Sequence, residues 1–324
     1  MPGDAMTWEF DASIGIYKNH QLSNELRKVA AGATIVAPFT HAHGINFKPN
    51  AGEGVNIMHI ERLPNSVSSR LQENNRIPIR KTAFGNRIIK VMEMGEGVEY
   101  TNLMLRLGKF NIKDELQKLL KTQMEEALDT ESATAFMDSA AVKLVFTPTS
   151  LTGGTWATDG TPGALATAGL TFDHCTILAD YLRDTIHCPP YEGDNFVGIS
   201  ANKNLRSLKQ DRYWQEWHKY LSKGDFVFKG EMGMTERIRW VECNRALAFS
   251  NVAGASSYLG QAVIFGDDAV ARITAETPHL RLDTNYQSDF GRSQACAWYG
   301  IIGIGSVWDS ADDGKAKIIR LDSL

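Results

Sequence analysis

The sequence predicts an α+β fold, in which helices and strands intermingle without the regular repeat of a parallel β–α–β protein. Two observations predict this class. Apolar side chains at three- and four-residue spacing follow Asn111 and continue to about Ala141, which indicates one long helix. Beyond residue 170, short strand-like runs alternate irregularly with amphipathic helical segments. With 324 residues, the chain is long enough for two or three packed units.

Composition and charge exclude several function classes. Hydrophobic residues make up 43% and charged residues 22% of the chain, and the formal net charge is −4. The chain therefore lacks the basic excess of non-specific nucleic-acid binders. No apolar stretch reaches the length of a membrane span, and residues 1–4 do not predict a signal peptide. The wide spacing of the four cysteines favours free thiols in a reducing cytoplasm.

Residues 1–45 are expected to form an extended arm. Polar and small apolar positions alternate here without a long period, apart from a helix-like stretch at 21–31. A segment that cannot bury its own surface must lie on the body of its subunit or on a neighbouring one.

Residues 46–99 are predicted to form two strands joined by a long excursion. The runs 55–63 and 87–94 are rich in β-forming residues, and 98–107 continues the return. Between positions 66 and 91, six basic side chains and one acidic side chain give a local net charge of +5. This asymmetry indicates an acidic or phosphate-bearing partner, and a solvated hairpin with scattered charges is the alternative. The basic side chains are Arg70, Arg76, Arg80, Lys81, Arg87 and Lys90.

The long helix is capped by Asn111 or Asp114 and spans nearly 30 residues, about 45 Å at 1.5 Å per residue. The Thr- and Gly-rich stretch 147–169 follows and predicts a crossing loop between two units. It does not have the form of a phosphate-binding loop. The acidic side chains of the helix that could meet the basic loop are Glu125, Glu126, Asp129 and Glu131.

The second unit is predicted at 166–275. A helix at 171–184, a strand at 196–199 and a short helix at 202–209 precede an aromatic helix at 211–221. A strand at 237–243 follows. Helical spacing of the aromatic residues indicates a buried face. The predicted core side chains are Tyr213, Trp214, Trp217, Leu221 and Trp240.

Three patches carry a resemblance to one family. The first is 211–243, with its aromatic helix, its Gly230-Glu231-Met232-Gly233 break and its final strand. The second is an apolar strand running into Gly266-Asp267-Asp268-Ala269. The third is Asp289-Phe290-Gly291-Arg292 with the run 295–299, in which Phe290 and Tyr299 stand where the family has leucine and lysine. In this order, over roughly residues 90–308, the patches resemble the major capsid proteins of tailed bacteriophages, in the branch of the N-four-type podoviruses.

The resemblance implies the Hong Kong 97-type capsid fold and its parts. These are an N-terminal arm (1–45), an extended loop (46–99), a peripheral domain with a spine helix (100–165 and 276–324) and an axial domain (166–275). The extended loop would lie over the adjacent subunit, so the six basic loop residues and the four acidic helix residues become candidate inter-subunit contacts.

The implied function is that of a shell subunit. Hexamers and pentamers of the chain would form the icosahedral virion head around double-stranded DNA, without sequence-specific binding, after assembly in the cytoplasm of a bacterial host. Separate scaffolding, portal and decoration proteins are possible partners, and no cofactor or membrane is expected. An encapsulin-like compartment shell of the same fold is an alternative.

The remaining alternative is a metal-dependent hydrolase that uses His41, His43 and His59. A metal site needs further ligands and groups that orient them, and no His-Glu-x-x-His pair is present. The glycines of 300–305 lie in a strand-like run with no helix after it. They are therefore expected to allow close sheet packing and not to bind a dinucleotide. No catalytic residue is predicted.

Overall fold

The computed structural model describes most of the chain beyond residue 33. Every described residue belongs to one compact unit within residues 32–324. The predicted helix at 21–31, Arg70 and Leu221 lie outside the described residues. The described residues are 34–43, 52–61, 63, 73, 76–77, 79–107, 111–138, 142–147, 157–158, 168–219, 228, 230–243, 260–283, 292–308 and 315–323.

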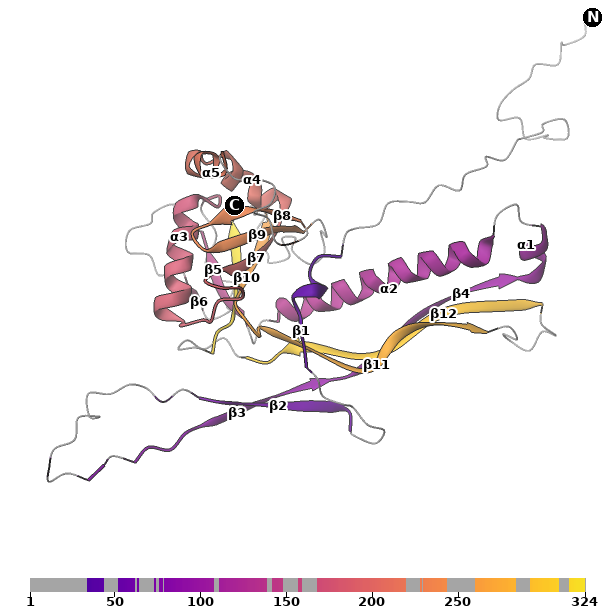
Figure 1. The fold of residues 1–324 in the computed structure, drawn as a ribbon, viewed down its shortest axis with the longest axis horizontal. Coiled ribbons are helices and arrows are strands. Elements are labelled where there is room, and N and C mark those ends of the chain that lie inside the picture. Colours follow the sequence, from indigo (N-terminus) through magenta and orange to yellow (C-terminus); the bar gives the residue numbers. More distant parts are fainter. Residues whose placement is uncertain are drawn as a thin grey trace, which may run out of the picture. The chain divides into compact units, whose positions relative to one another are not determined.

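The larger sheet has seven strands in the order β6-β5-β13-β10-β7-β9-β8 (Figure 1). Strand β13 runs parallel to β5, and β7 runs parallel to β9, whereas β10 is antiparallel to both of its neighbours. The sheet is thus mixed, as an α+β fold predicts. The strands are β5 (Val142–Phe146), β6 (Ala157–Thr158), β7 (Phe196–Ala201), β8 (Glu231–Thr235), β9 (Ile238–Cys243), β10 (Gly260–Phe265) and β13 (Ile318–Ser323).

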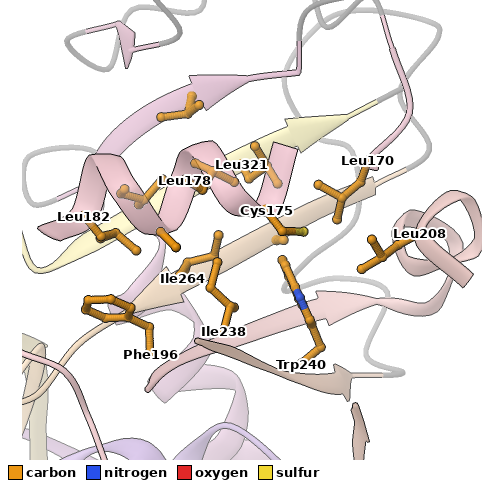
Figure 2. Close-up of a cluster of buried hydrophobic side chains, with 14 of the residues drawn as sticks. Leu170, Cys175, Leu178, Leu182, Phe196, Leu208, Ile238, Trp240, Ile264 and Leu321 are labelled. Atoms are coloured by element: carbon orange, nitrogen blue, oxygen red, sulfur yellow. The ribbon is translucent and has the colours of Figure 1, made fainter. Parts of the chain in front are cut away.

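Both faces of this sheet are buried. Ile264 of β10 and Trp240 of β9 pack with Leu178 of the helix above them, as Figure 2 shows. Val263, the neighbour of Ile264, packs on the other face with Phe136. Adjacent strand residues point to opposite faces, so a continuous apolar strand such as β10 fills two cores at once. The helices of this part are α3 (Phe172–Asp180), the π-helix η4 (Tyr181–Thr185), α4 (Asn202–Gln210) and α5 (Arg212–His218).

A second sheet has four strands in the order β1-β11-β12-β4, and the long helix α2 packs on one of its faces. The contact is made by Tyr100 and Trp298 from the sheet and Leu120 from the helix. The indole N–H of Trp298 also donates to the side-chain oxygen of Gln123. The elements are β1 (His41–Ala42), β4 (Met92–Thr101), α1 (Asn102–Leu107), α2 (Ile112–Phe136), β11 (Val270–Asp283) and β12 (Ser293–Ser306).

Strands β2 (Gly54–Ile60) and β3 (Phe84–Lys90) form a separate antiparallel hairpin. Its base rests on the second sheet through Ile89, which packs with Ile273 and Val307. Glycines of β12 permit this approach: a Cβ at Gly303 would lie 2.6 Å from the carbonyl oxygen of Lys90. The prediction that the glycines of 300–305 allow close packing is therefore confirmed.

Several predicted elements differ in extent from the structure. Helix α2 has 25 residues and ends at Phe136, because the apolar residues after it belong to β5 and its core. The predicted return strand 98–107 is instead the end of β4 followed by α1. Within the predicted loop 147–169, residues Ala157–Thr158 pair as β6 with β5.

Sheet membership also bears on the predicted domain boundaries. The sequence predicts 142–146 and 318–323 in the peripheral domain, and β5 and β13 pair in the sheet that contains β7, β9 and β10. The apolar pattern of a strand shows that it is buried but not which sheet it joins. The pairing of β5 and β13 with this sheet is an observation, and the four predicted domain boundaries stay predictions.

Candidate assembly surface

Asp129 of α2 holds the first described residues of the body. Its Oδ1 accepts the backbone N–H groups of Ile35 (3.1 Å), Val36 (2.7 Å) and Ala37 (2.9 Å), where the short 3₁₀ helix η2 (Ala37–Phe39) begins. The side chain is 0% exposed. Asp129 shares a helix face with the buried Ala133 and lies one turn before it, so it points into the subunit. The prediction that Asp129 contacts a neighbour is therefore wrong.

Among the predicted basic contacts, Arg76, Arg80, Lys81 and Lys90 are exposed. Arg87 is different. Its guanidinium lies 2.5 Å from a carboxylate oxygen of Asp138 and donates to the carbonyl of Trp308 at 3.1 Å. Strand alternation places Arg87 on the same face of β3 as the buried Ile89. Arg87 is thus paired within the subunit, and its contact with a neighbour stays a prediction.

The outer face of the hairpin is apolar and exposed. Residues that point away from the body alternate with those that pack on it, as the register of β2 with β3 requires. Clustered apolar side chains exposed on a soluble protein mark an interaction site. The four large side chains of this face are Met58, Ile60, Phe84 and Ile88.

The other acidic candidates on α2 differ in exposure. Glu125 is exposed, whereas Glu126 and Glu131 are partly buried. The same helix carries basic side chains, and Lys118 pairs with Glu115 at 2.9 Å. The surface of α2 is therefore of mixed charge, and a role for its carboxylates between subunits stays a prediction.

The predicted aromatic core is only partly correct. Trp240 and Trp214 are buried, and the indole N–H of Trp240 donates to the Thr235 hydroxyl at 2.7 Å. Tyr213 is 62% exposed and Trp217 is 47% exposed, which corrects the prediction that they are core residues. Helix α5 is short and only one side of it touches the sheet, so aromatic residues around the rest of its circumference stay outside.

The three histidines of the hydrolase alternative do not form a metal site. The rings of His41 and His43 lie 5.4 Å apart, whereas His59 packs on Trp308 at 5.2 Å in the hairpin. Across the described ranges, no group of three or more His, Cys, Asp and Glu side chains is arranged to hold a metal ion. The hydrolase alternative gains no support.

Strand β4 carries a feature that the sequence analysis missed. Glu93, Glu96 and Glu99 are exposed along this edge strand, and only Glu93 has a side-chain contact given by the structure, the hydroxyl of Tyr299 at 3.0 Å. The signal was present, because residues 91–105 contain three acidic residues and no basic one.

These parts together define a class: the chain has the Hong Kong 97-type fold of phage capsid proteins. Among solved structures, the capsid asymmetric unit of cyanophage Pam1 matches with a TM-score of 0.74, 15% identity, and 98% of this chain and 99% of that one covered. The acid-stable capsid of Helicobacter pylori bacteriophage KHP30 matches with a TM-score of 0.69 and 12% identity over 98% and 99% of the two chains.

The capsid of Ralstonia phage GP4 matches with a TM-score of 0.65 and 15% identity, with 98% of each chain covered. At these identities the likeness establishes the fold. No protein-family model and no curated protein sequence matches the chain. Within the part that the structure describes, no helix is long and apolar enough to cross a membrane.

Proposed function

We propose that this chain is the major capsid protein of a tailed phage, the subunit that self-assembles into the icosahedral head. The observation that carries the proposal is a fold match over 98% of the chain and 98–99% of the Pam1, KHP30 and GP4 capsid chains. The role is structural, and no part of it requires a reacting group or cofactor.

The exposed surfaces support a subunit that is completed by its neighbours. The outer face of the hairpin presents large apolar side chains, among them Met58 and Phe84, and basic ones follow at Arg80 and Lys81. Burial of such a face against another copy would stabilise both copies, since the gain scales with the apolar area removed from water. Hexamers and pentamers of a shell offer this burial to every copy.

The proposal includes partners and location. The assembled head would enclose double-stranded DNA without reading its sequence, and it would form in the cytoplasm of the bacterial host. Its candidate partners are separate scaffolding, portal and decoration proteins. An encapsulin-like compartment uses the same fold, and the nucleic acid inside purified particles separates the two functions.

Negative-stain microscopy of the expressed chain, alone and with candidate scaffolding proteins, tests the proposal. We expect closed shells or capsomers. Arg76→Glu together with Arg80→Glu is expected to prevent assembly while leaving the far-ultraviolet circular dichroism unchanged. A compact monomer whose unfolding is independent of concentration under all these conditions would refute the shell function.

A further inference from the structure

The hairpin of β2 and β3 touches its own subunit through contacts of two kinds. At its base, where only Val91 separates β3 from β4, the contact is apolar, and Ile89 packs there with Ile273. Farther along the hairpin the contacts are charged. The ammonium group of Lys315 lies 2.7 Å from a carboxylate oxygen of Glu61, just beyond β2. The hairpin is therefore held by an apolar contact at its base and by ionic contacts farther out.

Arg87 of β3 makes the second charged contact. Its Nη2 lies 2.5 Å from Oδ2 of Asp138, and its Nη1 donates to the carbonyl oxygen of Trp308 at 3.1 Å. His59 of β2 packs on the indole of the same Trp308, with the ring centres 5.2 Å apart. Both strands of the hairpin thus meet one tryptophan. The ion-pair partners and this tryptophan are here called the clasp: Glu61, Arg87, Asp138, Trp308 and Lys315.

Contacts with the body of the subunit hold Trp308 in place. Its indole N–H donates to the carbonyl oxygen of Asp268 at 2.6 Å, in the turn between β10 and β11. The ammonium group of Lys317 lies 4.6 Å from the centre of the indole ring, which is a cation–π distance. Lys317 is buried beside the start of β13. The indole is therefore anchored in the body, and the side chains of the hairpin are the ones that can leave it.

The body side of the clasp lies where the chain passes between the two sheets. Trp308 and Lys315 belong to the connection from β12 of the four-stranded sheet to β13 of the seven-stranded sheet. Asp138 lies between α2, which packs on the four-stranded sheet, and β5 of the larger sheet. The clasp thus joins the hairpin to two connections between the sheets. A change at this junction would reach the hairpin through the clasp.

The ion pairs of the clasp can open while the hairpin stays folded. The side chains of Arg87 and Asp138 are 26% and 38% exposed. Those of Lys315 and Glu61 are 27% and 36% exposed. Water and salt therefore reach both pairs, and ion pairs open to solvent contribute little to stability. The hairpin itself is held by seven registered residue pairs between β2 and β3, and its base by the buried Ile89. Opening the clasp removes neither of these.

From these contacts we propose that the clasp is a salt-sensitive conformational device of the single subunit. When it is closed, it fixes the direction in which the hairpin leaves the body. When it is open, the hairpin turns about the apolar contact at Ile89 while the pairing of β2 with β3 is kept. A few residues at the end of an element commonly act as such a hinge. The proposal goes beyond the shell function, because it concerns one copy and holds without assembly.

The distance between two spin labels tests the proposal. One label is attached at Met58→Cys on the exposed face of the hairpin, and the other at Glu125→Cys on the exposed side of α2. All four native cysteines are buried, so the labels react with the introduced thiols. In dilute, unassembled protein at low salt we expect one narrow distance distribution. Lys315→Glu with Asp138→Lys should widen it about twofold or more, because both ion pairs become like-charge contacts.

Further variants of the labelled protein make the test specific. Lys315→Glu alone should widen the distribution, and adding Glu61→Lys, which exchanges the charges of that pair, should restore the narrow one. The matched control is Arg212→Glu, which breaks a 2.9 Å ion pair with Glu216 on α5 and should leave the distribution unchanged. Hydrogen exchange at the amides of β2 and β3 should remain as slow as in the wild type in every variant, because the hairpin keeps its fold.

Three results would overturn the proposal. One is an unchanged distribution in Lys315→Glu with Asp138→Lys, since the clasp would then not set the direction of the hairpin. Another is widening together with fast exchange across β2 and β3, because the clasp would then hold the fold of the hairpin. The third is a wild-type distribution that stays narrow at about 1 M salt, where the Debye length is about 3 Å. These measurements need no shell, so their result is independent of whether the chain assembles.

Discussion

The Oδ1 atom of Asp129 accepts the backbone N–H of Val36 at 2.7 Å, across 93 positions of sequence. The same oxygen receives two neighbouring N–H groups, so one buried carboxylate fixes the backbone where the body of the subunit begins. Bonds from backbone N–H groups to a carboxylate are roughly twice as strong as neutral ones. The long helix α2 thus also anchors residues 35–37, which lead into β1.

Asp129→Ala is expected to lower the free energy of unfolding by about 1–3 kcal/mol, because three N–H groups, two of them in buried hydrogen bonds, lose their acceptor. Denaturant unfolding measures the change. Glu125, one turn before Asp129, is exposed, so Glu125→Ala serves as the control, with an expected change within about 0.5 kcal/mol. Equal effects of the two substitutions would contradict the anchoring role.

Trp240→Ala should lower the free energy of unfolding much more than Trp217→Ala. Trp240 is fully buried with its indole N–H bonded to Thr235, so its truncation is expected to lower the unfolding free energy by about 3–5 kcal/mol. Trp217 is 47% exposed and touches Phe172 at a ring distance of 6.2 Å, and its loss should change the unfolding free energy by about 1 kcal/mol or less. The measurement is the denaturant midpoint of each variant, and a larger shift for Trp217 would overturn this assignment.

Gly303→Ala and Gly305→Ala test how closely the base of the hairpin packs on β12. A Cβ at Gly303 would lie 2.6 Å from a backbone carbonyl, which cannot give way without moving β3. A Cβ at Gly305 would meet only side-chain atoms of Ile89, at 3.2 Å or more. We therefore expect Gly303→Ala to lower the unfolding free energy by about 1–3 kcal/mol and Gly305→Ala by less. Faster amide exchange at Ile89 in the Gly303 variant alone would locate the change in the hairpin.

The buried thiols should make the stability of the folded protein fall as the pH rises above 9. Burial raises the pKa of the Cys175 thiol to about 12 and that of Cys188 to about 11, compared with about 9 for free thiols. Above pH 9 the unfolded chain ionises these thiols while the folded chain keeps them protonated. The unfolded state then binds fewer protons, so stability is full below pH 9 and falls as the pH rises to 11–12.

Unfolding measured from pH 8 to 11 should show this fall, and it should be smaller in Cys175→Ala at matched temperature. The native protein should also resist alkylation at pH 8.5, with all four cysteines buried. Rapid alkylation of Cys175 in the folded protein would show that the site opens locally.

Much of the fold could be predicted from local sequence patterns, whereas the candidate assembly surface could be predicted only in part. Helix α2 and strands β7, β9 and β10 were predicted because each has a strong apolar period or run. The exposure of Trp217 was not predictable, since the spacing of aromatic residues shows that a helix has an apolar side but not how much of it a sheet can cover.

Asp129 and Arg87 illustrate a second reason why the site could not be fully predicted from the sequence. Their charges suggested surface contacts, yet their places on a helix face and a strand face turn both side chains into the subunit. The partners Val36 and Asp138 are distant in sequence, so only the tertiary arrangement brings them together. The glutamates of β4 are the opposite case. Their acidic run is visible in the sequence, but the sequence does not show that β4 lies at the edge of its sheet.

The direct passage of β3 into β4 has a mechanical consequence. Strand β4 is joined to β12 by ten registered residue pairs, from Met92 with Ile302 to Thr101 with Ser293. The hydrogen bonds of this ladder lie across the strands, so a pull on the hairpin along its length loads them in shear. All of them resist together and do not open one after another. Tension that another copy applies to the hairpin would therefore pass along the main chain of β3 and β4. The ladder between β4 and β12 would transfer that tension to the rest of the sheet.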